Sequence, residues 1–342
     1  MHKRLWALAL AVCLFAGSAG AQVLELSGND VKKNVNAVIR TIRESENVEK
    51  VVFDKAVISP ENLQLLHDTF PELEMEYSVS VLGKRVSSAA EEINLYKTPI
   101  NGGKDFEKLV KAIEWLPHLK EIRALDSSFT YDEMVRIHEA RPDVHVYAKM
   151  RVNKHYVRTD VTAFSTRHSK TSTRYSSDDM RSLKYIDNLL ALDIGHNAVD
   201  NLDFLYDLPN LRILILADNQ ITDLTPIASL KNLEYLELFI NPITDLSPLA
   251  ELENLIDLHV GECQISDFSP LYGLKKLDRL WISANPFTDE EVAKLRQALP
   301  DTTINTTASE IATTAEGWRQ GHPRYLTIVD IFEKSKYKEF DK

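Results

Sequence analysis

Cysteine and glycine are scarce in this chain of 342 residues, and both shortages limit what the protein can be. Two cysteines cannot build a disulfide scaffold, and eleven glycines without a Gly-rich loop provide no phosphate cradle of the kind that nucleotide enzymes use. The ten histidines lack metal-ligand spacing, and the nucleophile motif G-x-S-x-G is missing. We therefore expect no catalytic residue, no metal site and no cofactor.

Basic side chains are also under-represented: 40 stand against 51 acidic ones, which gives a formal net charge of -11. A general nucleic-acid binder needs a basic surface, so the charge argues against that class of protein. The hydrophobic content of 44% is enough for a sizeable core, which excludes wholesale disorder. The length allows two domains or one elongated repeat protein.

The N-terminus, residues 1–21, has the pattern of a secretory signal peptide. Lys3 and Arg4 precede an apolar run over residues 5–16, and small residues lead up to Ala21. The alternative, a membrane span, needs about 20 apolar residues, and this run has about 12. We predict cleavage after Ala21.

No later segment is long and apolar enough to span a membrane, and lipidation is not expected because the bulky Val12 precedes Cys13. Cleavage would leave Cys263 as the only cysteine of a soluble, secreted or periplasmic protein. Its net charge would be about -13, since two basic residues are removed.

A regular repeat runs from Leu189 to Ile304. In each repeat one asparagine or cysteine serves as a reference position. Leucines stand eight and five positions before it, another apolar residue stands three positions before it, and one more stands two positions after it. The reference positions form an evenly spaced column that consists of Asn197, Asn219, Asn241, Cys263 and Asn285.

This spacing is the leucine-rich-repeat pattern L-x-x-L-x-L-x-x-N/C-x-L, in which each unit gives one strand to a curved parallel sheet. Alternate apolar side chains point into the core, and the asparagine amide can bond loop backbone groups that would otherwise be unsatisfied. Because cysteine is a known substitute there, we expect Cys263 to be buried rather than reactive.

The return segments repeat as well, as D-[LF]-[ST]-P-[LI] beginning at Asp223, Asp245 and Asp267. They resemble the 22-residue, internalin-like class of bacterial leucine-rich repeats, over five units or about a third of the chain. The resemblance implies a bacterial solenoid with a binding concave face. It does not imply adhesion, because the surface anchor that such proteins often carry is absent.

Residues 22–148 show a looser version of the same organisation. The strand spacing at Val48–Phe53 recurs at Leu119–Ala124, and helical patterns cover Pro60–Thr69 and Tyr131–Ala140. We predict irregular strand–helix repeats continuous with the solenoid, the alternative being a separate small α/β domain. Residues 77–87 alternate around Leu82-Gly83-Lys84 and predict a β-hairpin insertion.

Residues 149–184 form a basic, Ser/Thr-rich insertion with nine basic and three acidic side chains, or +6. Residues 185–304 carry 20 acidic and 7 basic side chains, or -13, so the net charge hides an acidic solenoid beside a basic segment. The favoured interpretation of the insertion is a solvated loop, and the alternative is an arm that contacts an anionic partner.

Residues 305–342 have apolar positions at helical spacing beyond Pro323. The last repeat of an open solenoid must be covered, so we predict a C-terminal cap in which Trp318 and the helix pack on the end of the core. A recognition role for Trp318 is the alternative. The whole chain is thus expected to be an α/β leucine-rich-repeat solenoid with a curved parallel β-sheet and a helical C-terminal cap.

The repeat register also places side chains on the outer, concave face of the sheet. Exposed apolar groups there need a cover, and aromatic and Arg side chains are typical interface anchors. The alternative cover is the tail, the basic insertion or a neighbouring molecule. The predicted binding residues are Ile213, Ile215, Tyr235, Glu237, Phe239, Asp257, His259, Arg279 and Trp281.

These observations favour an exported protein-protein interaction module whose partner, a protein and not a nucleic acid, binds the concave face. We expect Tyr235→Ala with Trp281→Ala to weaken partner capture while leaving thermal stability nearly unchanged. The alternatives are an extracytoplasmic enzyme with an active site in residues 22–188, which would need a deep polar pocket, and a self-associating envelope structural protein.

Overall fold

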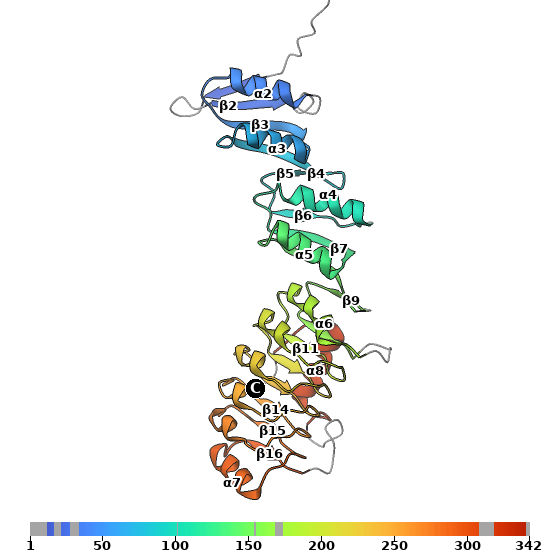
Figure 1. The fold of residues 1–342 in the computed structure, drawn as a ribbon, viewed down its shortest axis with the longest axis vertical. Helices are drawn as coiled ribbons and strands as arrows, with labels where there is room; N and C mark the ends of the chain where they lie inside the picture. The colour runs from blue at the N-terminus through green and yellow to red at the C-terminus, as the bar shows by residue number, and fades with distance from the viewer. Residues whose placement is uncertain are drawn as a thin grey trace, which may run out of the picture. The chain divides into compact units, whose positions relative to one another are not determined.

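The computed structural model describes residues 12–16, 22–27, 34–100, 102–153, 155–167, 174–307 and 318–339. The chain divides into two compact units, unit 1 (Met1–Ala148) and unit 2 (Lys149–Lys342) (Figure 1).

Unit 1 alternates strands with helices. Its five-stranded sheet has the order β1-β2-β3-β4-β5, in which β2, β3 and β4 run parallel. A second, four-stranded sheet has the order β6-β7-β8-β9. Its elements are β1 (Val12–Ala16), β2 (Gln22–Ser27), α2 (Val35–Glu44), β3 (Val48–Val57), α3 (Pro60–Thr69), β4 (Glu74–Val81), β5 (Lys84–Ser87), β6 (Glu92–Asn94), α4 (Gly103–Ile113), β7 (Glu121–Phe129), α5 (Tyr131–Ala140) and β8 (His145–Val152).

The helices and the hairpin predicted in this unit are confirmed. Helices α3 and α5 have the predicted bounds, and β4 pairs with β5 in an antiparallel hairpin. Side chains that cap the first turns explain where the helices begin. The Ser59 hydroxyl accepts from the Asn62 N–H, and Thr130 with Glu133 forms a capping box.

Most of the predicted signal peptide, residues 1–21, lies outside the described residues. Its residues 12–16 are described as β1, which pairs antiparallel with β2. A search of the described part of the chain finds no helix with the length and apolarity that a membrane crossing requires.

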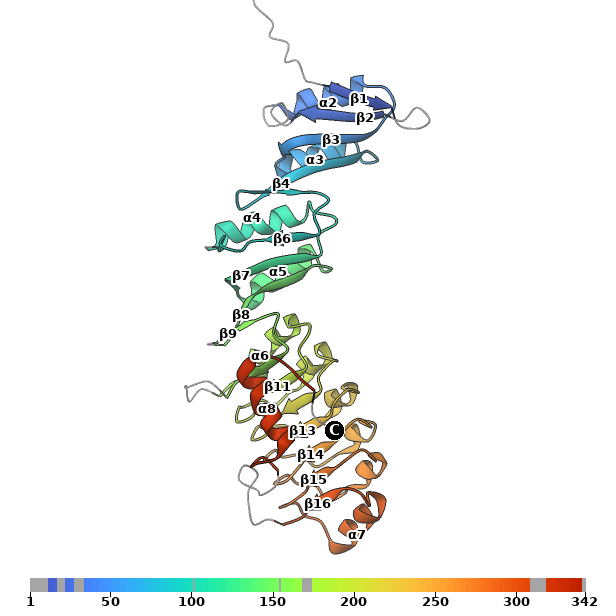
Figure 2. The same cartoon turned by 180° about the vertical axis from the view of Figure 1, so that it is seen from behind.

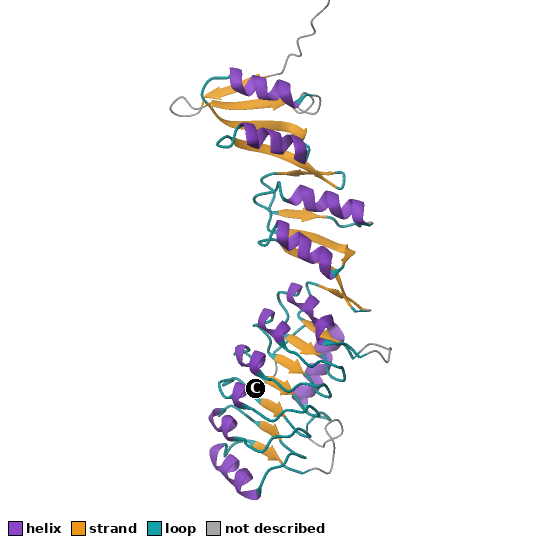
Figure 3. Cartoon of the chain, viewed as in Figure 1, coloured by secondary structure: helices purple, strands orange, loops and turns teal. Residues whose placement is uncertain are grey.

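Unit 2 is built on a seven-stranded sheet in which every neighbouring pair is parallel, in the order β10 to β16. Strands line one side of the unit and short helical turns line the other (Figure 3). The strands are β10 (Ala163–Ser165), β11 (Ala191–Asp193), β12 (Ile213–Ile215), β13 (Tyr235–Glu237), β14 (Asp257–His259), β15 (Arg279–Trp281) and β16 (Thr303–Asn305). The turns are η3 (Asp203–Asp207), η4 (Thr225–Ser229), η5 (Ser247–Leu249) and η6 (Ser269–Gly273). In the last repeat, helix α7 (Asp289–Ala298) takes the place of such a turn.

The predicted asparagine ladder is present beside the sheet. The Asn241 amide donates to the carbonyls of Leu216 and Leu238 at 3.0 and 2.8 Å, and its oxygen accepts from the Ile221 N–H at 3.0 Å. These backbone groups lie in the interior, where losing a hydrogen bond costs about 1–3 kcal/mol for each group left unsatisfied. The Cys263 thiol donates to the Leu238 carbonyl at 3.6 Å, so it replaces one part of the asparagine pattern. Burial raises the pKa of Cys263 to about 11, which agrees with an unreactive thiol.

The return motif is explained by local capping of the short turns. Asp223 accepts from the Thr225 N–H at 2.8 Å, and Pro226 occupies the first turn of η4, where no N–H is needed. The same arrangement recurs at Asp245 and Asp267 with η5 and η6. Each motif thus begins a short helical turn at the same position of its repeat.

Where they are described, most of the residues interpreted as a basic insertion form strands and helical turns. β8 and β9 (His155–Arg158) form a hairpin, β10 is the first strand of the large sheet, and α6 (Ser177–Met180) with η2 (Arg181–Tyr185) is its convex return. Phe164 pairs with Leu192, a spacing longer than that of the regular repeats, which is why a search at their period misses this unit. The expectation of a solvated loop is therefore wrong for these segments. Residues 154 and 168–173 lie outside the described residues.

Candidate functional site

The nine predicted binding residues come together on the concave face of unit 2. The strand register sets Tyr235 between Ile213 and Asp257, and His259 between Glu237 and Trp281. All nine are buried, with at most 5% of any of them exposed. Their expected exposure to solvent is not observed, because the chain's own C-terminal segment, residues 318–339, covers them.

The C-terminal segment crosses the concave face from β15 back to β10, the first strand of the sheet (Figure 2). Trp318 lies over β13 to β15, and helix α8 (Pro323–Lys334) then reaches β10. At the far end the Tyr337 N–H donates to the Thr162 hydroxyl at 2.7 Å. Ile328, Ile331 and Phe332 of α8 share one buried cluster with the concave-face residues. Each such side chain contributes about 1.5–3 kcal/mol by leaving water.

The Glu237 carboxylate is the first of two charged anchors beneath this segment. It is fully buried and ion-paired with Arg319, whose Nε donates to Oε1 at 3.1 Å and whose Nη2 donates to Oε2. The Trp318 indole donates to Glu237 at 2.8 Å, and the Tyr235 hydroxyl donates to it as well. Burial alone would raise the pKa of Glu237, but the charge of Arg319 and these donors hold it below its ordinary value.

Asp257 is the second anchor, and it holds two arginines at once. Arg279 on the neighbouring strand donates to both carboxylate oxygens at 2.8 and 2.6 Å. Arg324 of α8 also contacts both, each at 2.8 Å, and it donates in addition to Asp278. The Arg279 guanidinium reaches the segment too, since it donates to the Trp318 carbonyl at 2.9 Å. The segment is thus attached at two points, by the bidentate Arg324–Asp257 pair and by the Arg279 bond to the Trp318 carbonyl.

Trp318 fills the aromatic centre of the face. Its ring centroid lies 5.5 Å from that of Tyr235, 5.0 Å from that of His259 and 5.1 Å from that of Trp281. The Arg279 guanidinium stacks over the indole at 4.5 Å. Each aromatic pair is worth about 0.5–1.5 kcal/mol beyond the area it buries. Trp318 therefore acts here as the kind of anchor that proteins commonly use at interfaces.

Two expectations are corrected by this arrangement. The predicted cap helix exists, but α8 and Trp318 lie on the concave face, while α7 and β16 form the last repeat. Tyr235→Ala with Trp281→Ala removes buried aromatic groups, so a substantial loss of stability replaces the expected neutrality. The partners missed by the sequence interpretation are Arg319 and Arg324. The sequence could have indicated them. Glu237 and Asp257 stand among apolar residues of the sheet, and carboxylates buried there need basic partners from elsewhere in the chain.

The two buried carboxylates of the concave face already have partners. Both carboxylates are already ion-paired with arginines, and no cluster of three metal-ligating side chains occurs in the described ranges of the chain. In unit 1, a pocket of about 510 Å³ includes the half-buried Asp105 and the exposed Lys108, which are ion-paired at 3.1 Å.

His259 links the stability of the face to pH. Burial is the main reason that its pKa falls to about 3, and the nearby charges of Arg319 and Arg279 act in the same direction. Its Nδ1 accepts from the Gly261 N–H at 3.1 Å, which requires the neutral ring. The unfolded chain takes up a proton below pH 6.5 and the folded chain does not, so stability falls between pH 6.5 and about 3.

We therefore predict that His259→Gln flattens the acid side of the stability profile. Between pH 6.5 and pH 5 the unaltered chain should lose about 2 kcal/mol more unfolding free energy than the variant. Urea unfolding at both pH values measures the difference. Equal losses in the two proteins would show that His259 is not held neutral in the fold.

Comparison with known proteins agrees with the repeat assignment. Residues 209–251 match a family model described as leucine rich repeats in two copies. Among solved structures, an internalin C2 of Listeria monocytogenes is 22% identical, covers 67% of this chain and 88% of its own, and has a TM-score of 0.36. A leucine-rich-repeat protein of Leptospira interrogans is 16% identical, covers 82% and 95%, and has a TM-score of 0.32. No curated protein matches the chain.

Because the identities are below 25% and the TM-scores below 0.5, the fold assignment depends on the strand register and the asparagine ladder. The strand register and the asparagine ladder are those of a leucine-rich repeat. The family model matches residues 209–251, which include β12 and β13 in the middle of the sheet. Unit 2 of this chain is a leucine-rich-repeat solenoid of the 22-residue class.

Proposed function

We propose that this chain is an exported leucine-rich-repeat protein that acts as a protein-protein interaction module through the concave face of unit 2. The observation that supports it is the C-terminal segment itself. The face holds a peptide segment through one tryptophan and two arginines, bound to Glu237 and Asp257. A surface that binds such a segment of its own chain is suited to bind a similar segment of another protein.

A partner on this face has to compete with the C-terminal segment. Because the segment is tethered, it rebinds at an effective concentration near the millimolar range, which disfavours weak competitors. The segment would therefore restrict binding to partners with matching aromatic and basic anchors. Glu237 adds to that selectivity, because a partner without basic groups would leave its carboxylate buried and without an ion pair.

Weakening the segment should open the face. We predict that a chain with Trp318→Ala and Arg319→Ala binds a labelled synthetic peptide of residues 318–339 about a hundredfold more tightly than the unaltered chain does. Adding Tyr235→Ala and Trp281→Ala should abolish that gain, since the peptide's tryptophan loses its contacts. Fluorescence anisotropy measures the binding, and a peptide with alanine in place of Trp318 and Arg319 is the matched control.

The same peptide tests the partner assignment. A protein that the opened chain captures from cell-envelope extracts should be released by the peptide and not by its alanine control. Capture that the peptide leaves unchanged would place the partner elsewhere and contradict the proposal for the concave face.

Export is proposed from the pattern of residues 1–21. The protein processed in a secreting bacterial host should begin at Gln22 on N-terminal sequencing, and Ala21→Phe should block this processing. A protein that retains Met1 after secretion would contradict the proposed signal peptide.

A further inference from the structure

Two hydrogen-bond donors of the concave face are left unused by the C-terminal segment. They are the Nε2 atom of His259 and the indole N–H of Trp281, whose side chains are buried, with 1% and 5% of each residue exposed. Neither atom has a hydrogen-bond partner in the described part of the chain. Buried polar groups in folded proteins are nearly always hydrogen-bonded. Two such atoms on one binding surface therefore indicate a contact that the chain does not supply itself.

The Nε2 atom of His259 is a donor and not an acceptor. The Nδ1 atom of the same ring accepts from the Gly261 N–H at 3.1 Å, so the single proton of the neutral ring lies on Nε2. Burial lowers the pKa of His259 to about 3, and the ring therefore stays neutral at pH 7. The indole of Trp281 can only donate. Both atoms thus require the same thing, which is an oxygen that accepts a hydrogen bond.

The two donors belong to neighbouring side chains under Trp318. His259 on β14 and Trp281 on β15 are partners in the strand register. Their ring centroids lie 5.0 and 5.1 Å from that of Trp318. An indole has no hydrogen-bond acceptor, so Trp318 covers both donors without bonding to either.

The carboxylates of the face do not supply the acceptor either. Glu237 is ion-paired with Arg319 and accepts from the Trp318 indole. Asp257 is ion-paired with Arg279 and Arg324. Neither carboxylate accepts from the two unused donors.

The covering segment also contains buried polar atoms without a partner. Among the described residues, nothing hydrogen-bonds to the Nδ1 atom of His322 or to the hydroxyl of Tyr337. A polar atom that leaves water without gaining a hydrogen bond costs free energy. The segment therefore matches the face at its ion pairs and its aromatic ring, but not at these atoms. A ligand that makes the missing hydrogen bonds has an advantage over it.

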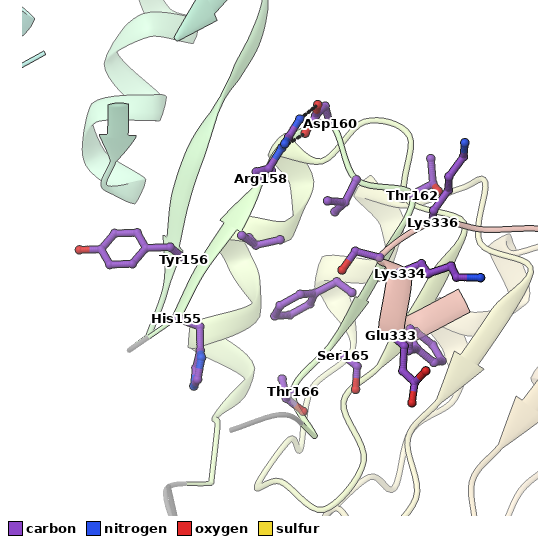
Figure 4. A pocket seen from close by; sticks show the side chains of 15 residues that line it. His155, Tyr156, Arg158, Asp160, Thr162, Ser165, Thr166, Glu333, Lys334 and Lys336 are labelled. Atoms are coloured by element: carbon purple, nitrogen blue, oxygen red, sulfur yellow. Dashed lines mark hydrogen bonds and ion pairs between the residues drawn. The ribbon is translucent and has the colours of Figure 1, made fainter. Parts of the chain in front are cut away.

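The missing hydrogen bonds belong to the concave face and not to the pocket of about 630 Å³ beside β10. Residues between 155 and 166, together with residues 332–336 at the end of α8, line that pocket (Figure 4). Neither His259 nor Trp281 is among them. An acceptor for these two donors therefore has to enter where Trp318 lies on the sheet.

We propose that the partner of the concave face carries, beside its tryptophan and arginine anchors, a side chain whose oxygen atoms accept hydrogen bonds from His259 and Trp281. This inference rests on the proposed function, because it names the chemistry of the segment that replaces the C-terminal one. Asp, Glu, Asn and Gln side chains all have such oxygens. The added hydrogen bonds give the partner an advantage that offsets the tether of the chain's own segment.

Peptides displayed on phage supply the probe. The target is the chain with Trp318→Ala and Arg319→Ala, and the library is the peptide of residues 318–339 preceded by three randomised residues. The same peptide preceded by three alanines is the reference. We expect enrichment of Asp, Glu, Asn or Gln before the tryptophan, and binding about tenfold tighter than that of the reference. Enrichment of carboxylates alone would identify a charged acceptor, and enrichment of all four residue types a neutral one.

Removing each donor tests its role. His259→Leu and Trp281→Phe, made separately in the target chain, each remove one N–H. Each should lower about fivefold the ratio of the affinities of the enriched and reference peptides. The ratio cancels general changes in packing, since both peptides experience them. His259→Gln keeps an N–H group in the side chain and should retain most of the ratio.

Failure of this inference differs from failure of the proposed function. If the reference peptide does not bind the target chain, the concave face is not a binding surface and both are wrong. If it binds, three results would overturn the acceptor alone. They are enrichment of apolar residues before the tryptophan, an advantage that survives both His259→Leu and Trp281→Phe, and an equal advantage for the natural peptide of residues 315–339. In the last case the chain itself would supply the acceptor.

Discussion

The buried carboxylate of Glu237 is the constraint on which the concave face depends. Its position on β13 is fixed by the repeat register, and the aromatic and apolar side chains around it exclude water. An unpaired charge there would cost several kcal/mol, so the fold requires an opposite charge to arrive from elsewhere in the chain. Arg319, far along the chain in the C-terminal segment, supplies it, and Trp318 and α8 are brought onto the sheet with it.

The closed face and the proposed binding activity follow from the same chemistry. Asp257, on the next strand, is a second buried carboxylate, and it is ion-paired with Arg279 and Arg324. The C-terminal segment is therefore held by two carboxylates of the concave face. These anchors make the sheet selective for segments that carry tryptophan and arginine. The chain's own segment meets that requirement, and any partner on the face must meet it too.

The sequence predicts those parts of the structure in which local spacing decides the outcome. The regular columns place β11 to β15 and the asparagine ladder, and capping residues define α3 and α5. Two features were missed because they depend on contacts between distant segments. The spacing from β10 to β11 is longer than one regular period, and the pairing of these strands is visible only in the sheet. The tail was predicted to lie at the end of the solenoid. Apolar spacing shows which face of a helix is buried, but it does not show the surface against which the helix packs. Here Arg319 and Arg324 determine that surface through their ion pairs with Glu237 and Asp257.

A double-mutant cycle on Glu237 and Arg319 tests the central claim most directly. Unfolding free energies are measured for the unaltered chain, Glu237→Gln, Arg319→Gln and the double variant. Each single variant leaves one charge buried without its partner and should lose about 3 kcal/mol, whereas the double variant should lose far less than the sum. Losses that simply add would show that the two side chains do not interact, and the C-terminal segment would then not lie on the concave face.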